Sequence, residues 1–545
     1  MASSSTAPPP IAIVGIGAVL PGASNADALW PVVEGGVDMA RDVPAERWVL
    51  SPAAAVVPGG PRPDRVYAPR AALVDPDIAP CFDGLDVDRQ AVAALDPSVG
   101  LLLHAGAGAG RAAATDRVDR SRAGIVAGNI ILPTDGASAL SDWIVGGSLR
   151  RRLFESAGMP VPPPEAAPPS VWNRWVAALP IGILAQSLSF GGDHTSLDAA
   201  CASSLFAVHL AAGALRRGDA DFMLAGGLSR PSSLYTQMGF SQLRALSPSG
   251  RCSPFDARGD GLVVGEGAGM VALKRLDDAL RDGDKVWAVL RGSGLSNDLD
   301  GNLLAPSTEG QLRAMTAAYA EARWEPGAVD FIECHATGTP VGDAVEIQSI
   351  RALIEGGAER PFLGAVKANV GHLLTGAGAA ALIKTLLAMD RGVVPPVANF
   401  GSPSPRIDLD AAPVRIPTEA RSWPEGRARR AAVSGFGFGG TNAHLLLEHA
   451  DGIDARRSVV QVPAAPAKVA IVGMAAHIGP WRTLAAVRER LFGFDATPPT
   501  PKSAFGGEPS PQAGWFIDTL DVPLGVYRIP PSELAALLPQ QLLAL

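Results

Sequence analysis

Short apolar runs that end in glycine alternate along the chain with longer stretches of helical periodicity. Residues 11–15 (IAIVG) form a β-branched run closed by glycine, which is typical of a buried strand. The stretch from Leu197 to Arg216 is rich in alanine and leucine and predicts a helix. Further strand or helix signals occupy residues 126–129, 181–188, 222–227, 263–273, 329–333 and 362–366. This alternation predicts an α/β architecture built in layers.

Three kinds of segment interrupt the pattern. The first ten residues, MASSSTAPPP, lack both a basic start and an apolar stretch, so residues 1–10 are expected to be a disordered tail rather than a secretion signal. Proline-rich residues 57–70 and 158–170 predict loops, and residues 451–467 lose periodicity and predict a linker. We therefore expect one large unit over residues 11–450.

After the linker, the chain repeats part of its own beginning. Residues 469–475 (VAIVGMA) restate residues 11–17 (IAIVGIG), and FIDTLDV at 516–522 parallels FDGLDV at 82–87. A second, shortened copy of the opening unit is therefore expected over residues 468–545. This copy contains no cysteine.

Composition narrows the class of protein. A chain of 545 residues that is 47% hydrophobic and 18% charged predicts two to four folding units with a sizeable core. The net charge of −8 offers no basic face for nucleic acid. The four cysteines form no CxxC pair, which argues against structural zinc and favours a reducing cytoplasm. No apolar run approaches the roughly 18 to 20 residues of a membrane span.

The glycines after the first strand suggest a dinucleotide-binding site, but the full G-x-G-x-x-G pattern of such sites is absent. Gly15 and Gly17 are followed by a misplaced third glycine, Gly22, and no strand with a terminal acid follows at the expected distance. A tight turn explains these glycines, so no nicotinamide cofactor is inferred.

Cys201 is the first candidate for chemistry. A lone cysteine among alanines is commonly an inert core residue. However, its neighbours in DAACASS are all small, so a ligand could approach it closely. It also stands where the predicted helix starts, and the helix dipole there would stabilise a thiolate. A thiolate attacks thioesters without a strong adjacent base.

Two histidines follow predicted strands, where loops of α/β folds carry function. His335 comes directly after residues 329–333, although a purely structural histidine remains possible. His372 closes the segment KANVGH, which also supplies Lys367 and Asn369. The last candidate is the loop SGFGFGGTNAH at 434–444, whose glycines free backbone amides to face a ligand. It lacks the lysine and Ser/Thr of a phosphate-binding loop.

Together these segments resemble the β-ketoacyl synthase family of the thiolase superfamily. The resemblance runs from about residue 11 to residue 448 and includes a further match at 247–269. Its four motifs are DAACASSL, ECHATGTPVGDAVE, KANVGHLLTGAGAA and GFGFGGTNAH. It implies a thiolase-like fold of two similar βα halves in a five-layered α-β-α-β-α arrangement, commonly in a homodimer.

The resemblance also implies a role for each matching residue. Cys201 would accept an acyl chain, and the backbone N–H groups of Cys201 and Phe438 would form an oxyanion hole. His335 and His372 would bind the malonyl thioester and promote its decarboxylation. Lys367 would organise the site through a carboxylate, with Glu346 the best candidate, and Asn369 lies in the same segment. No bound cofactor or metal is implied, because acyl carrier protein presents the substrates on phosphopantetheine.

The repeat after residue 468 resembles a chain-length-factor-like unit of the kind that follows a ketosynthase in polyunsaturated fatty acid synthases. The stretch LPTDGAS at 132–138 resembles the same synthases. The alternative is a non-elongating scaffold that retains the fold and binds carrier protein. A thiolase-like degradative enzyme is disfavoured, since it needs a second cysteine near the last glycine loop and none lies beyond Cys334.

Overall fold

The computed structural model separates into two compact units, Met1–Pro463 and Ala464–Leu545. Most of the expected tail (1–10) and linker (451–467) lies outside the described residues. The described residues are 9–113, 117–130, 132–163, 167–231, 233–299, 305–354, 360–409, 414–452, 469–503, 509–523, 525–526, 529–534 and 536–544.

The first unit is built on a ten-stranded sheet with the order β10-β9-β13-β14-β8-β1-β7-β6-β4-β5. One half of it consists of β1 (Ile11–Val19), β4 (Ala123–Gly128), β5 (His194–Leu197), β6 (Phe222–Ser229) and β7 (Gly267–Arg275). The other half consists of β8 (Ala288–Asn297), β9 (Phe331–Glu333), β10 (Phe362–Gly364), β13 (Arg430–Gly437) and β14 (Thr441–His449). Within each half the spatial order is third, second, fourth, fifth, first strand, so the two halves share one topology.

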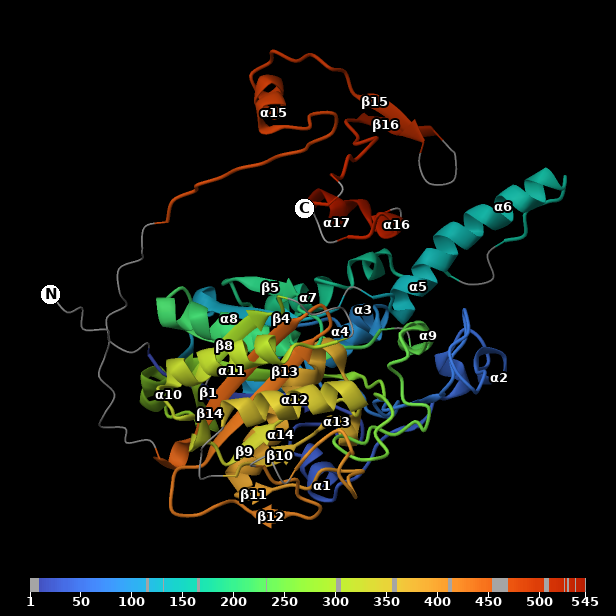
Figure 1. Cartoon of the computed structure of the whole chain (residues 1–545). Helices are drawn as coiled ribbons and strands as arrows, with labels where there is room; N and C mark the ends of the chain where they lie inside the picture. Colours follow the sequence, from blue (N-terminus) through green and yellow to red (C-terminus); the bar gives the residue numbers. More distant parts are fainter. Residues whose placement is uncertain are drawn as a thin grey trace. The chain divides into compact units, whose positions relative to one another are not determined.

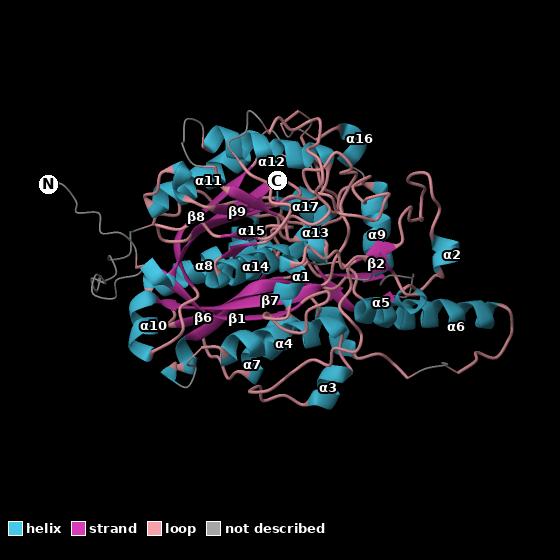
Figure 2. Ribbon diagram, turned by 90° about the horizontal axis from the view of Figure 1, so that it is seen from below, coloured by secondary structure: helices cyan, strands magenta, loops and turns pink. Residues whose placement is uncertain are grey.

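Helices form three layers around the two halves, as Figure 2 shows. The central layer holds α8 (Ser203–Arg217) and α14 (Ala377–Arg391), and one outer layer holds α4 (Pro97–Arg111) and α7 (Leu179–Ser187). The other outer layer holds α11 (Thr308–Ala322) and α12 (Pro340–Leu353). Leu205 of α8 and Leu386 of α14 belong to a core that includes strand residues of both halves. This arrangement is the five-layered thiolase-like fold that the sequence predicts.

The remaining elements are short and lie mainly at the periphery (Figure 1). They are α1 (Leu29–Glu34), β2 (Arg41–Asp42), α2 (Pro52–Ala55), β3 (Arg70–Ala71), α3 (Arg89–Ala93), α9 (Ser233–Gln242), α10 (Leu276–Asp282), α13 (Lys367–Val370), β11 (Val393–Val394) and β12 (Arg421–Ser422). An arm of α5 (Asp135–Ser141), a π-helical turn (Asp142–Gly146) and α6 (Gly147–Ser156) projects from this unit.

The predicted strands at 11–15 and 222–227 are confirmed as β1 and β6. The helix predicted from Leu197 to Arg216 was placed too early, because it begins at Ser203. Residues 194–197 instead pair in parallel with β4 as an edge strand. Cys201 therefore lies in a turn between a strand and a helix.

The second unit has few regular elements. They are α15 (Leu484–Leu491), β15 (Thr500–Ser503), β16 (Pro509–Gly514), α16 (Pro531–Leu534) and α17 (Pro539–Ala544). Residues 469–475, which repeat the sequence of β1, form no strand, and Val472 is 96% exposed. In the first unit β1 is a buried strand that pairs with β7 and β8, which begin only at Gly267 and Ala288. The repeat has no corresponding strands within the described part of residues 468–545.

Candidate active site

A tight turn between β5 and α8 holds Cys201. Ala200, just before it, has φ of 49°, a conformation that costs energy for a residue with a side chain. The Ser203 hydroxyl fixes the turn by accepting from the Ala199 N–H (2.8 Å) and donating to the Ala200 carbonyl (2.6 Å). Thr441 donates to the Ala199 carbonyl at 2.8 Å. These hydrogen bonds hold a strained backbone that positions a thiol with 6% exposure.

The two histidines are each fixed by a backbone donor. His335 follows β9, and its Nδ1 accepts from the Phe436 N–H at 3.2 Å. His372 follows α13, and its Nδ1 accepts from the Leu374 N–H at 3.0 Å. Because a backbone N–H can only donate, each neutral ring carries its proton on Nε2. Both imidazoles can therefore donate a hydrogen bond from Nε2.

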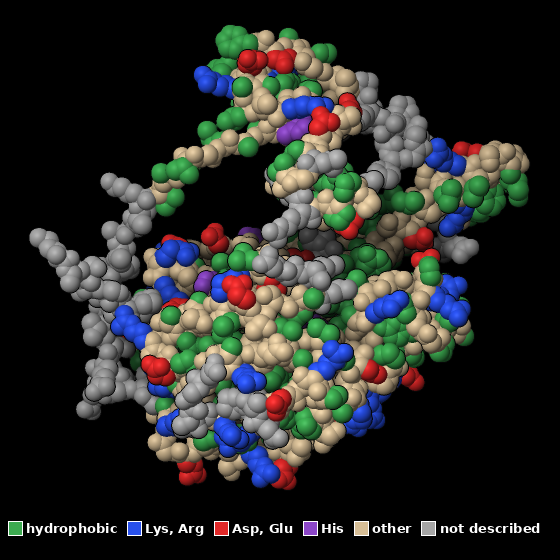
Figure 3. Space-filling view, in the orientation of Figure 1, with side chains coloured by type: hydrophobic (Ala, Val, Ile, Leu, Met, Phe, Trp, Pro, Cys, Tyr) green, Lys and Arg blue, Asp and Glu red, His purple; other side chains and the backbone are tan. Residues whose placement is uncertain are grey.

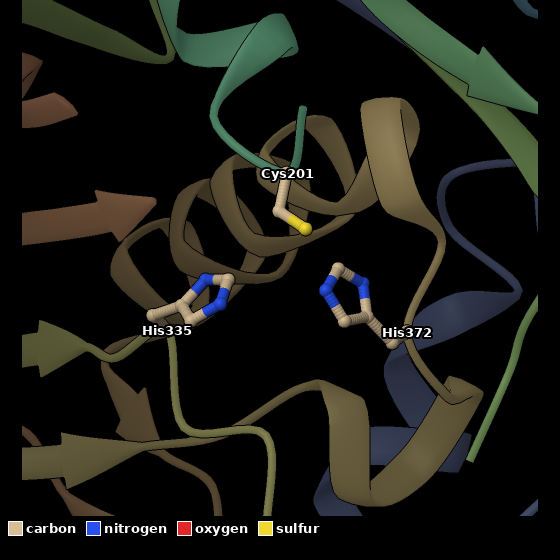
Figure 4. Close-up of side chains that lie close together, drawn as sticks. All are labelled: Cys201, His335 and His372. Carbon is tan, nitrogen blue, oxygen red and sulfur yellow. The ribbon is translucent and has the colours of Figure 1, made fainter. Parts of the chain in front are cut away.

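These three side chains converge although they come from distant parts of the chain. The sulfur of Cys201 and one ring nitrogen of each histidine lie within 4.8 Å of one another. The ring centroids of His335 and His372 are 5.5 Å apart, with the planes at 82°. Figure 4 shows the sulfur directed between the two rings. The fold thus assembles the predicted cluster.

A cavity of about 230 Å³ leads to the cluster. Both histidines line it, together with Thr337, Thr339 and Phe438. Cys201 is not part of its wall, so the imidazoles are the groups that the cavity presents most directly.

Burial sets the charge state of the cluster. It lowers the pKa of His335 and of His372 well below 6.5, and the Lys367 ammonium lowers both further. Burial raises the pKa of the Cys201 thiol to about 11, although Lys367 and the backbone N–H of Phe438 oppose that rise. Cys201 lies just before helix α8, as expected, and burial opposes the thiolate that this position was expected to stabilise. The cluster is a neutral thiol with two neutral imidazoles.

The glycine loop approaches the cysteine turn closely. Gly437 has no room for a side chain, because a Cβ there would lie 2.3 Å from Thr441 Oγ1 and 2.8 Å from the Ala199 carbonyl. The next residue, Phe438, has a backbone N–H that lowers the pKa of the Cys201 thiol. The backbone N–H groups of Cys201 and Phe438, which the family resemblance implies as oxyanion donors, both favour negative charge on this sulfur.

Glu346 supports the His335 loop. Its carboxylate accepts from the backbone N–H groups of His335 (2.7 Å) and Ala336 (2.8 Å). Burial lowers the pKa of Lys367, and the Glu346 charge acts in the opposite direction. Glu346 thus interacts with Lys367 through its charge, while both of its oxygens hydrogen-bond to the backbone.

Asn369 connects the His372 segment to the beginning of the chain. Its side-chain amide donates to the carbonyls of Val32 (3.3 Å) and Val37 (3.0 Å). Its backbone carbonyl accepts from the Met39 N–H at 2.8 Å. In this structure Asn369 holds the segment in place rather than lining the cavity.

Sequence reasoning assigned no role to Asp343, although it quoted the motif that contains it. The buried Asp343 carboxyl accepts from the backbone N–H groups of Phe255 (2.8 Å) and Gly338 (3.2 Å), and burial raises its pKa to about 7. It lies three residues before Glu346 on α12, so both carboxyls occupy one face of the helix. That spacing is the signal that could have found it.

The same three side chains could in principle bind a metal, since cysteine and histidine are zinc ligands. Zinc requires a thiolate. A bound metal would itself displace the thiol proton, but the buried Lys367 ammonium, which lowers the pKa of both imidazoles, would repel a cation. The charge of Lys367 therefore disfavours a metal ion at this cluster. In the described ranges, no helix combines the length and apolar character needed to cross a membrane.

The chain belongs to the β-ketoacyl synthase family. Residues 9–279 match the β-ketoacyl synthase N-terminal domain, 287–401 its C-terminal domain and 403–476 the ketoacyl-synthetase C-terminal extension. The family defines the fold as thiolase-like and the chain as a ketosynthase of the kind found in polyketide synthases.

Similar proteins are much longer than this chain. A phenolphthiocerol/phthiocerol polyketide synthase component of Mycobacterium tuberculosis is 37% identical over 459 residues, which cover 81% of this chain and 23% of that protein. A spectinabilin polyketide synthase system protein of Streptomyces orinoci is 38% identical over 461 residues, which cover 81% of this chain and 12% of that protein. This chain thus spans about a quarter or less of the length of these relatives.

Solved structures agree with the family. The PfaC keto synthase–chain length factor aligns with a TM-score of 0.82 and 33% identity, covering 91% of this chain and 53% of that one. The ketosynthase from module 6 of the bacillaene synthase of Bacillus subtilis 168 aligns with a TM-score of 0.68 and 28% identity, covering 81% and 72%.

Proposed function

We propose that the chain is a β-ketoacyl synthase that joins an acyl group on Cys201 to a malonyl group carried by acyl carrier protein. The observation that carries this proposal is the convergence of the Cys201 sulfur with a nitrogen of both His335 and His372 within 4.8 Å. The substrates would enter on phosphopantetheine, and no cofactor of the protein's own takes part.

In the first half-reaction, the Cys201 sulfur attacks the acyl thioester carbonyl. A new C–S bond forms, the old one breaks, and the thiol proton leaves with the pantetheine thiolate. Negative charge builds on the carbonyl oxygen, where the N–H groups of Cys201 and Phe438 would stabilise it. Both N–H groups favour negative charge beside Cys201, which supports this role.

In the second half-reaction, the malonyl thioester loses CO₂ and its C–C electron pair forms an enolate. The Nε2 donors of His335 and His372 would hydrogen-bond to the thioester oxygen on which this charge develops. The enolate then attacks the acyl-Cys201 carbonyl, and the Cys201 thiolate leaves. Fixed neutral donors suit this step because they need no proton transfer before the charge appears.

Lys367, Glu346 and Asn369 would act as organising residues rather than as reactants. Glu346 holds the backbone of the His335 loop, and Asn369 holds the His372 segment. The Lys367 charge would keep both imidazoles neutral and favour the thiolate that forms on Cys201 during turnover.

The identity of the second unit and the kind of biosynthesis are inferred from the same structural match. The first unit is about 85% of the chain, whereas the match to PfaC keto synthase–chain length factor covers 91%, so it includes part of the second unit. This supports residues 468–545 as the start of a chain-length-factor-like unit after a 451–467 linker, in polyketide or polyunsaturated fatty acid synthesis.

The four free cysteines support a cytoplasmic location.

Pairing with a second ketosynthase-like unit, in a homodimer or with a chain-length-factor-like partner, is part of the proposal. The projecting arm exposes apolar side chains that a monomer would not be expected to leave in water (Figure 3). They are Trp143 (42%), Ile144 (54%), Val145 (63%), Leu149 (57%) and Leu153 (59%). Light scattering after size exclusion would measure the state of assembly.

The test of the function separates its two half-reactions. Octanoyl N-acetylcysteamine thioester should add one octanoyl group, seen by intact mass, to the wild-type chain and none to Cys201→Ala. With malonyl carrier protein, Cys201→Ala should still release CO₂, and Cys201→Ala/His372→Ala should lose about 100-fold or more of that rate. Absence of a Cys201-dependent adduct would favour the scaffold alternative. Equal CO₂ release by the two variants would refute the role of His372.

A further inference from the structure

A fully buried ion pair lies between the segments that carry the two histidines. Glu333, the last residue of β9, and Lys384, in the middle of α14, have side chains that are 0% exposed. Their Oε2 and Nζ atoms are 2.8 Å apart. Neither atom has a well-directed hydrogen bond in the described part of the chain, so the contact is essentially between two charges.

The second oxygen of Glu333 reaches the other histidine segment. Oε1 accepts from the Val366 N–H at 2.5 Å. Val366 immediately precedes Lys367, on the segment that ends in His372, whereas Glu333 is two residues before His335. One carboxylate therefore links the beginnings of both segments.

The surroundings are shaped to admit this carboxylate. Gly364, opposite Glu333 in the parallel pair of β10 and β9, has no space for a side chain. A Cβ at Gly364 would lie 2.2 Å from Glu333 Oε2 and 2.3 Å from the Phe331 ring. The Lys384 ammonium is 5.9 Å from the centre of the same ring. A glycine and an aromatic face thus enclose the pair.

Stability alone does not account for such a pair. Taking two charges out of water costs more than their attraction commonly returns, and well-packed apolar replacements are often as stable or more so. Breaking the pair by removing one partner is strongly destabilising, because one charge is left buried alone. A function that an apolar pair could not perform explains the ion pair better. The hydrogen bond from the Val366 N–H to Glu333 is such a function.

We propose that Glu333 and Lys384 are a positioning pair that sets the His372 segment against His335 and thereby serves malonyl decarboxylation. Lys384 holds the carboxylate in place, and the carboxylate holds the Val366 N–H. Cys201 depends on other contacts, those of Ser203 and Thr441. Loss of the pair should therefore affect the second half-reaction more than the first. This inference rests on the proposed function.

The test measures both half-reactions in the full chain. Glu333→Gln keeps the size of the side chain but removes its charge. We expect CO₂ release from malonyl carrier protein to fall about 10- to 100-fold, and the rate of octanoyl addition to Cys201 to stay within about twofold. The apolar pair Glu333→Leu/Lys384→Met should unfold thermally no earlier than the wild type and still release CO₂ slowly.

A matched control is the buried pair of Lys274 and Asp284, whose side chains are 1% and 0% exposed and whose charged atoms are 2.7 Å apart. Lys274 lies on β7 and also pairs with Asp282 at 3.0 Å, and neither Lys274 nor Asp284 belongs to a segment that carries Cys201, His335 or His372. Lys274→Met should lower thermal stability without changing the ratio of the two rates.

Two outcomes would overturn the proposal. One is a Glu333→Gln variant whose two rates fall together, as a loss of folded protein would produce. The other is an apolar pair that decarboxylates at the wild-type rate. A wild-type chain that releases no CO₂ would instead contradict the proposed function itself.

Discussion

The backbone N–H of Leu374 donates a 3.0 Å hydrogen bond to Nδ1 of His372, two residues earlier. Leu374 has φ of 46°, so this donor is aimed by a backbone conformation that residues with side chains seldom adopt. The bond leaves the proton on Nε2, the nitrogen free to serve substrate. The strained backbone at Leu374 thus leaves Nε2 of His372 as the ring nitrogen that can donate.

The first prediction concerns pH. Because burial holds the pKa of both His335 and His372 well below 6.5, decarboxylation of malonyl carrier protein should be nearly constant between about pH 6 and pH 8. A fall in rate centred near pH 6.5 would contradict neutral, buried imidazoles.

The same shifts predict how stability changes with pH. A lowered pKa in the folded state means that the unfolded chain takes up protons first as pH falls, so the contribution to stability is present above about 6.5 and is lost below it. The denaturation midpoint should therefore drop between pH 7.5 and pH 5. The His335→Gln/His372→Gln variant should show a smaller drop.

The second prediction concerns the reactivity of Cys201. With the thiol pKa raised to about 11, alkylation by iodoacetamide should accelerate about tenfold per pH unit between about pH 8 and pH 10 without levelling off. Peptide mapping would distinguish Cys201 from the half-buried Cys81, and Cys201→Ala provides the blank. A plateau reached below pH 8 would indicate a thiolate at rest.

The third prediction concerns Glu346→Gln. The carboxylate accepts from two backbone N–H groups, whereas an amide offers one oxygen and turns an NH₂ towards the second donor. The free energy of unfolding should fall by about 1–3 kcal/mol, measured by urea denaturation.

Glu309→Gln is the matched control for that variant. Glu309 is exposed on α11 and pairs with Arg313 one turn later. Its loss should change stability by no more than about 0.5 kcal/mol. Equal effects of the two substitutions would mean that the His335 loop does not depend on Glu346.

The fourth prediction concerns Gly437→Ala. The new methyl group would collide with Thr441 and Ala199, so the backbone that carries the Phe438 N–H must shift. We expect a loss of about 1–3 kcal/mol in stability. Octanoyl addition to Cys201 should slow by about tenfold or more, because the second oxyanion donor is displaced.

Gly239→Ala tests whether that effect is specific. A Cβ at Gly239, in helix α9, meets no atom within 4 Å. This change should raise stability by up to about 1 kcal/mol through helix propensity and leave acylation unaltered. Slow acylation in the Gly239 variant would show that the effect at Gly437 is indirect.

The sequence by itself determined the family and the parts of the site that lie within short motifs. Runs such as IAIVG predicted β1, and the strand-then-polar pattern placed His335 directly after β9. These features are local: a strand is signalled by its own apolar run, and a loop residue by its place after that run.

Only the tertiary structure decided which atoms meet. Phe436 fixes the tautomer of His335, and Glu333 reaches Val366, across separations that no motif encodes. It also decided the burial of Cys201, which raises the pKa of its thiol. Residues 469–475 show the same dependence on tertiary contacts. They repeat the apolar run of β1 but form no strand, whereas β1 is paired with β7 and β8.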